Sequence, residues 1–325
     1  MTKYIGRRIS VGIGKESTRG TAVAAEYWLP WTGSLGFEGK VENAINESAQ
    51  GTIYDGQNSA LIKEWGEGSL DCLIGDKSSA LLFYSLLGTL ASVEKGADAG
   101  VYDHTISLAE TAQHQSLTLN VDEANGDKQY PLCVVDKIKI GFETGKILDM
   151  SVDLLSKKGA SAALTPAAVS ENLFRPQDFS FKIAADLASL EAASVVVLRS
   201  ASLEFNAAHE SDDVLGSTSP NDFLNKNFTV TGDFEFVYDS TTVEDYVLAG
   251  TQKALRFTIE NADVTIGASS HPKIKIDLCK VVFEELARKR DLNGIVTLKA
   301  SFKALYSVSN SKFGSIVVTN LATAY

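Results

Sequence analysis

The chain has 325 residues, 44% of them hydrophobic, and a formal net charge of -11; these values indicate a folded protein large enough for two domains and exclude a disordered chain. The acidic excess is shared by both halves of the chain, which excludes a basic surface that binds nucleic acid through its phosphates. Three cysteines without CxxC spacing exclude a disulfide framework and favour synthesis in a reducing cytoplasm.

The first 26 residues form a glycine-punctuated segment of mixed charge, without the apolar run of a secretory signal. Gly14-Lys15 is followed by Glu16, where a phosphate-binding loop needs Ser or Thr, and Ile9 stands where the first glycine of that motif belongs. A nucleotide site is therefore not expected. A membrane span is not expected either, because the longest weakly polar run, Ser78 to Val93, is too short to cross a bilayer.

A strand is predicted over Leu29 to Glu38, and a long polar stretch at residues 39–64 follows it. Loops of this length are uncommon in compact domains unless they have a function. We therefore expect an arm or hairpin that reaches a neighbouring subunit, although a mobile surface loop is the alternative. The candidate contact residues of this arm are Glu42, Asn46, Ile53, Tyr54, Leu61 and Ile62.

The segment Gly68 to Gly88 predicts a strand followed by a short helix. Leu70 and Cys72 share one strand face while Asp71 faces the other way, which is the period of two of a half-buried strand. Ser78 or Ser79 is expected to cap the helix, and Gly88 suits the left-handed position that ends it.

The same pattern returns in Gly232 to Gly250, with Thr241 or Thr242 as the expected helix cap. Upstream, Leu29 to Glu38 aligns without gaps on Val197 to Asn206, so that Leu35 is matched with Leu203. Downstream, a hairpin around Thr144-Gly145 matches one around Asn293-Gly294. The repeat predicts a mainly β fold of two tandem β-sandwich domains, each flanked by a short α-helix.

The domain boundaries follow from composition. Residues 161–173 are rich in Ala, Ser and Pro and are predicted to be a linker. The first domain then covers residues 1–160, including the N-terminal segment and the arm, and the second covers residues 174–325.

No catalytic, cofactor-binding or metal-binding residues are predicted, and the chain is not expected to be an enzyme. The four histidines have no second ligand at metal spacing, and no GxSxG motif is present. The acidic pairs, such as Asp212 with Asp213, would need a pocket to serve in catalysis. Glu67 with Asp71 and Asp233 with Glu235 lie instead on the polar face of the repeated strand. Asp149 and Asp153 are matched with Lys299 and Lys303, so the acidic character is local.

The chain resembles the major tail tube proteins of long-tailed bacteriophages. The resemblance rests on GIGKESTRGTA (residues 12–22), YWLPW (residues 27–31), the strand and helix of residues 68–88 and the hairpin KIKIGFETGKILDMSVDL (residues 137–154). It implies a structural virion protein, made in the host cytoplasm, whose β-sandwich subunits form stacked rings. Two tandem tube domains imply a homotrimeric ring with pseudo-sixfold symmetry around a channel through which DNA passes without specific binding.

The resemblance also implies a role for particular residues and partners. From their matched strand parity, Glu67, Asp71, Asp233 and Glu235 are expected to lie on the sheet that faces the channel, where an acidic wall keeps DNA from being trapped. The arm is expected to bridge rings or neighbours. Other expected partners are tail proteins such as the tape measure, baseplate and terminator proteins.

Two other functions remain open at this point. The chain could be another phage or secretion-system ring or tube component, which shares the architecture. It could also be a tandem β-sandwich module that binds glycans, for which Trp28 and Trp31 are the exposed aromatic candidates.

Overall fold

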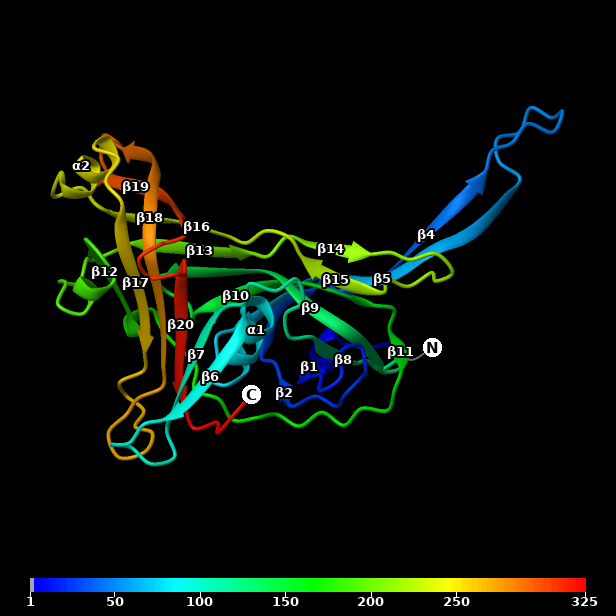
Figure 1. Cartoon of the computed structure of the whole chain (residues 1–325), viewed down its shortest axis with the longest axis horizontal. Coiled ribbons are helices and arrows are strands. Elements are labelled where there is room, and N and C mark those ends of the chain that lie inside the picture. The colour runs from blue at the N-terminus through cyan, green and yellow to red at the C-terminus, as the bar shows by residue number, and fades with distance from the viewer. Residues whose placement is uncertain (1–2) are drawn as a thin grey trace.

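The computed structural model describes residues 3–325, which form a mainly β fold with two short helices, as the sequence predicts (Figure 1). The helices are α1 (Ser78–Leu87) and α2 (Thr242–Leu248). The strands of the first half are β1 (Ser10–Lys15), β2 (Tyr27–Trp28), β3 (Trp31–Leu35), β4 (Glu38–Asn46), β5 (Asn58–Leu73), β6 (Gly88–Glu94), β7 (Tyr102–Leu108), β8 (Leu117–Asp122), β9 (Lys128–Glu143), β10 (Asp149–Lys157) and β11 (Ala160–Ser161). Those of the second half are β12 (Phe179–Ala184), β13 (Ser200–Asn206), β14 (His209–Asp212), β15 (Asp222–Asn225), β16 (Thr229–Val237), β17 (Lys253–Glu260), β18 (Lys273–Lys289), β19 (Thr297–Ala304) and β20 (Gly314–Asn320).

One antiparallel sheet, the long sheet, runs through both halves of the chain in the order β3–β5–β10–β9–β13–β16–β19–β18. Its middle contact joins the two halves, because β9 of the first pairs with β13 of the second, with Ile140 opposite Leu203. Along each strand apolar residues alternate with polar ones. Met150, Val152 and Leu154, for example, are buried on one face.

A second sheet, the covering sheet, runs in the order β12–β17–β18–β20–β7–β6. Strand β18 belongs to both sheets: its first residues pair with β17 and β20, and residues 281–289 pair with β19. In the first half, β2, β1, β8 and the start of β9 form a corresponding outer layer. The two sheets and α1 thus form a sandwich that is closed by strands from both halves.

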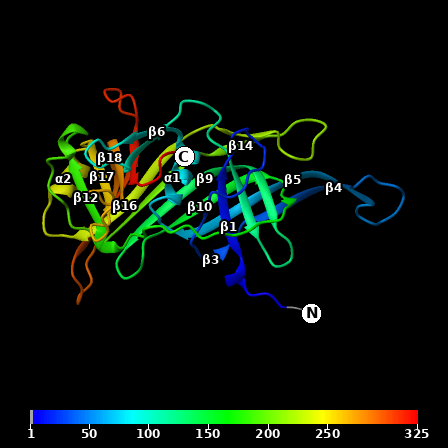
Figure 2. The same cartoon turned by 90° about the horizontal axis from the view of Figure 1, so that it is seen from below.

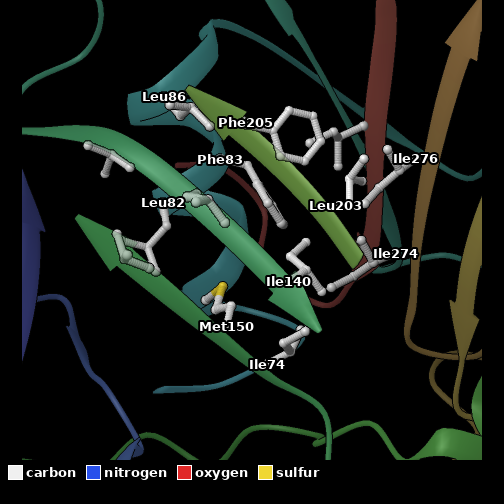
Figure 3. Packing of buried hydrophobic residues seen from close by; sticks show 14 of the residues in the cluster. Ile74, Leu82, Phe83, Leu86, Ile140, Met150, Leu203, Phe205, Ile274 and Ile276 are labelled. Atoms are coloured by element: carbon white, nitrogen blue, oxygen red, sulfur yellow. The ribbon is translucent and has the colours of Figure 1, made fainter. Parts of the chain in front are cut away.

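The hydrophobic core is continuous across the two halves. Helix α1 lies between the sheets, against β9 on one side and β6 and β7 on the other; its Phe83 points towards Leu203 and Phe205 of β13, and Ile274 and Ile276 of β18 follow beyond them in the same cluster (Figure 3). Nine of its ten residues are buried. In contrast, Val243 is the buried residue of α2, which lies at the far end of the molecule against β18 (Figures 1 and 2).

Two hairpins of the long sheet have the same register. Met150 of β10 faces Ile140 of β9, and Leu298 of β19 faces Arg288 of β18, so corresponding residues lie 148 positions apart. Each hairpin is interrupted by one extra residue at the same place, Asp136 in β9 and Glu284 in β18. A bulge at the same point is a strong constraint on the correspondence, because it shifts every later pair.

The ungapped alignment of Leu35 with Leu203 is wrong by two residues. Gly68 of β5 is matched with Gly232 of β16. A Cβ added at Gly68 would contact the carbonyl oxygen of Gly36, and a Cβ added at Gly232 would contact the carbonyl oxygen of Ser202. Gly36 therefore corresponds to Ser202. From Thr32 to Leu35, β3 advances by three residues while its partner β5 advances by one. The two extra residues of β3 cannot be recognised from apolar spacing alone.

The predicted helix caps are also corrected. The Ser78 amide and hydroxyl of α1 both donate to the Glu171 carboxylate, each at 2.7 Å, so the cap comes from the predicted linker. At α2, the Ser240 hydroxyl accepts from the Thr242 amide at 3.1 Å, while the Thr241 hydroxyl donates to Asp245. Both closing glycines have left-handed backbones, with φ of 86° at Gly88 and 61° at Gly250.

Candidate functional site

The cross-strand register places Glu67, Asp71, Asp233 and Glu235 on one face of the long sheet, opposite to its buried face. The row of directly paired residues that connects β5 to β16 is Asp71, Ser151, Lys139, Glu204 and Thr231. Thr231 has the same strand parity as Asp233 and Glu235, so the matched acidic residues share the face across the middle contact. We call this face the polar face.

Carboxylates outnumber lysines on the polar face between β5 and β19. The carboxylates are Glu67, Asp71, Glu143, Asp149, Asp153, Glu204, Asp233 and Glu235. The lysines are Lys137, Lys139, Lys157, Lys299 and Lys303. The face is therefore acidic overall but mixed, as the Lys299 and Lys303 positions already indicated.

The lysines neutralise some of the carboxylates. Lys299 lies 3.1 Å from Asp233, and Lys137 lies 3.8 Å from Asp153 and 3.9 Å from Glu204. Burial raises the pKa of Asp153, and the neighbouring Lys137 counteracts part of this rise. Asp71 and Glu235 have no lysine within ion-pair distance among the described residues. The unneutralised negative charge is thus spread over both halves.

The predicted arm is a long two-stranded hairpin of β4 and β5 that projects from the body of the molecule (Figures 1 and 2). Its apolar side chains are exposed, including Ile53 at 101% and Tyr54 at 82% of their full accessibility. Leu61 and Ile62 are also exposed, as are Glu42 and Asn46 on β4. An isolated two-stranded hairpin is marginally stable at best in water, and a group of exposed apolar side chains is typical of an interaction surface.

The base of the arm is supported by the β14–β15 hairpin of the second half. Lys63 donates to Ser211 at 2.8 Å and to Asp213 at 2.6 Å, and the Glu64 amide donates to the Thr218 carbonyl. The direction of the arm is therefore set by contacts that link residues about 150 positions apart in the sequence.

The N-terminal segment owes its pattern to a buried carboxylate. Glu16 is 3% exposed and accepts hydrogen bonds from the amides of Gly20 and Leu132 and from the hydroxyls of Ser116 and Thr118. This network is structural. The sequence gives no local signal for this network, because three of the four donors to Glu16 lie at least 100 positions away from it.

Arg19 ties the same N-terminal segment to the second half. Its guanidinium donates to Asp222 of β15, with Nε 2.8 Å from Oδ1, and to the carbonyl of His114. The carboxylate of Asp222 also accepts from Gln113 at 2.5 Å. An arginine at this spacing gives no recognisable signal for such a distant partner.

Trp28 and Trp31, the candidates for glycan binding, line one hollow despite their odd spacing. Ile9, Val11 and Pro166 also contribute to its wall. Trp31 is fixed by a 2.9 Å hydrogen bond from its indole nitrogen to the carbonyl of Ile9. The Glu171 carboxylate at the hollow is already engaged by the first turn of α1.

Among residues 3–325, no cluster of three or more His, Cys, Asp and Glu side chains has the arrangement of a metal site. The same part of the chain contains no helix that is long and apolar enough to span a membrane. Cys72, Cys133 and Cys279 are buried, and burial raises the pKa of the Cys72 thiol to about 12.

Comparisons with known proteins agree with this architecture. A search of curated proteins found no match. The model of the phage tail tube protein family matches residues 6–304, which is nearly the whole chain. The chain therefore belongs to the phage tail tube protein family and is a structural component of the virion tail tube.

Proposed function

We propose that this protein forms homotrimeric rings with pseudo-sixfold symmetry, and that these rings stack into the tail tube. The observation that carries the proposal is the long sheet, whose strand order β3–β5–β10–β9 is followed by the matching order β13–β16–β19–β18. A ring of three such chains contains six matching units, and closure removes the free sheet edges that otherwise promote aggregation.

The two units are proposed to be tandem domains, at residues 1–160 and 174–325, connected by the linker at residues 161–173. The common register and the common bulge support this division. The linker contains an ordered contact, because Glu171 caps α1. The domains are thus proposed to be related by duplication and to fold as one body through their shared core.

The polar face is proposed to line the channel. Carrying more carboxylates than lysines, it repels the phosphates of passing DNA, whereas a basic wall would retain them by releasing counterions. The four carboxylates Glu67, Asp71, Asp233 and Glu235 come from both units, so in a closed ring they repeat around the whole circumference.

The β4–β5 arm is proposed to bridge adjacent rings. Its exposed apolar tip, with Ile53 and Tyr54, is suited to contact a second copy. Tape measure, baseplate and terminator proteins are proposed as further partners, at the channel and at the two tube ends, and assembly is proposed to follow synthesis in the host cytoplasm.

Negative-stain microscopy of the purified chain tests the assembly. We expect rings, or tubes built of rings, whose averaged end views have sixfold appearance while the mass per ring corresponds to three chains. Compact monomers at high concentration, or rings of six chains, would contradict the proposal.

Charge reversal tests the channel wall. Tubes of a variant with Asp71→Lys and Glu235→Lys are expected to retain single-stranded oligonucleotides at low salt and to release them as salt rises. Wild-type tubes are expected to retain none. Tubes with Glu110→Lys, an exposed carboxylate outside the polar face, are the control and should behave like wild type. Equal retention by the variant and the control would show that the polar face is not the wall.

A further inference from the structure

The contact between β9 and β13 within the chain serves as a template for the contact between chains. We propose that residues 285–289 of β18 in one copy pair antiparallel with Gly36–Lys40 of the next copy, in the register of β9 on β13. This inference rests on the proposed ring and specifies which residues of two copies meet.

Both edges are free in the isolated chain. Beyond Val281, β18 pairs with β19 on one side and has no strand on the other in residues 3–325. Strand β3 and the start of β4 pair with β5 and likewise have no second partner in the described chain. Glu38, Lys40, Glu285 and Ala287 are exposed.

The correspondence of the strands determines the register. β9 corresponds to β18 at a distance of 148 positions, bulge included. The segment at Gly36 corresponds to the segment at Ser202. In the same way, Glu38 corresponds to Glu204, because their partners on the next strand, Glu67 and Thr231, correspond to each other. Within the chain, Ser202 faces Gly141, Leu203 faces Ile140, and Glu204 faces Lys139.

Transferring these pairs to two copies gives five contacts between β4 and its preceding residues in one copy and β18 in the other. The predicted pairs are Gly36 with Lys289, Phe37 with Arg288, Glu38 with Ala287, Gly39 with Leu286, and Lys40 with Glu285.

The side chains suit this register. On the polar face, Lys40 meets Glu285, and a pair of opposite charges directly across two strands is stabilising. On the buried face, Phe37 covers Arg288. The Arg288 guanidinium is already paired with Glu244 and stacked on Tyr238, so covering it leaves no unpaired buried charge.

The two helices support the same end of the molecule as the docking site. Helix α1 is buried against β6, β7 and β9 of its own half, and β18 contributes Ile274 and Ile276 to the same core beyond Leu203 and Phe205 (Figure 3). Helix α2 follows β16 as α1 follows β5, yet its Leu248 remains 75% exposed, and Leu292 and Ile295 nearby are exposed as well. A second copy at the β18 edge supplies the cover that α2 lacks within its own chain.

Engineered cysteines test the register. The double variant Glu38→Cys with Ala287→Cys places two thiols opposite each other across the proposed contact. Directly opposed residues in an antiparallel pair have Cα atoms about 4.5–5.5 Å apart, within disulfide range. Within one chain the two positions are separated by the width of the long sheet, roughly 30 Å, so no internal disulfide can form. The native cysteines are buried and give little background.

Two control variants are shifted by one pair along the same face: Glu38→Cys with Glu285→Cys, and Glu38→Cys with Lys289→Cys. A mild oxidant such as diamide is added to assembled protein, and denaturing gels without reductant are run. We expect disulfide-linked species up to the trimer at least about tenfold more abundant for the opposed pair, because the shifted positions lie roughly 7–8 Å apart.

The outcomes separate this inference from the proposed function. Rings that crosslink equally well or better in a control variant, or not at all in the opposed variant, overturn the register while leaving the ring intact. Wild-type protein that forms no rings overturns both. Hydrogen exchange of the wild type gives an independent readout: assembly should protect the amides of residues 36–40 and 285–289, and unchanged exchange there also overturns the register.

Discussion

Glu16 offers the sharpest test of how the N-terminal segment is held, because its carboxylate is surrounded by donors. Oε2 accepts from the Gly20 amide at 2.7 Å and the Ser116 hydroxyl at 2.6 Å. Oε1 accepts from the Leu132 amide at 2.8 Å and the Thr118 hydroxyl at 3.0 Å. The substitution Glu16→Gln keeps the shape of the side chain but replaces one oxygen by an NH₂ group.

The expected cost follows from which donors can adapt. A hydroxyl can rotate and accept a hydrogen bond, but an amide N–H cannot, so the Gly20 or the Leu132 amide must face the new NH₂ group. An unsatisfied buried donor costs roughly 1–3 kcal/mol, and the remaining bonds lose their charge assistance. We expect the free energy of unfolding to fall by about 2–4 kcal/mol. For a chain of 325 residues, this corresponds to a decrease in Tm of about 3–6 °C.

Chemical unfolding followed by tryptophan fluorescence, at a concentration where the protein is monomeric, measures this difference. Glu26→Gln is the matched control, because Glu26 lies in the same segment and is exposed. The control is expected to change stability by less than about 0.5 kcal/mol. If Glu16→Gln is as neutral as the control, the four hydrogen bonds do not hold the segment and the reasoning fails.

Three further changes have distinct expected outcomes. Phe205→Ala, at a fully buried site between the two sheets, should lower the free energy of unfolding by about 3–5 kcal/mol, whereas the exposed Leu215→Ala should be nearly neutral in the same unfolding assay. Ile53→Asp at the arm tip should leave rings intact but shorten or abolish tubes in micrographs, and Leu215→Asp should not. The Ser270 hydroxyl is the main cause that lowers the pKa of Asp98 to about 2, so the stability contributed by the ionised carboxylate is present above pH 4 and lost as the pH falls towards 2. Asp98→Asn should make the urea midpoint of unfolding change less with pH over this range. An unchanged pH dependence would contradict the assignment.

Features with a local physical signal could be predicted from the sequence. The strict alternation around Asp71 and Asp233 predicted strand parity, and parity alone brings these residues to one face of a continuous sheet. The two helices were predicted from their apolar runs, and their ends from Gly88 and Gly250. The mainly β fold was predicted for the same reason, because turn and strand signals are short-range, whereas the family was predicted from the resemblance of four sequence segments to tail tube proteins.

Features that depend on distant partners could not be predicted. The acceptor of the α1 cap, Glu171, lies 93 positions from Ser78, and a serine at the start of a helix is itself a common cap and gives no sign of such a partner. Arg19 and Asp222 are 203 positions apart. The register shift before Leu35 is a backbone irregularity of two residues, which leaves the apolar pattern on both sides intact. Each of these contacts is set by tertiary packing, which a single sequence does not encode in any local pattern.

The dependence of α1 on Glu171, and of the shared core on β18, has a consequence for synthesis on the ribosome. The residues of α1 leave the exit tunnel well before Glu171 is translated, and Ile274 and Ile276 follow about a hundred residues later still. The first half therefore cannot complete the shared core until β18 has been translated, although nascent domains commonly fold in order of emergence. A nascent polypeptide that still lacks β18 has only one of the two sheet edges proposed to join neighbouring copies, so copies on one polysome cannot polymerise prematurely through that contact.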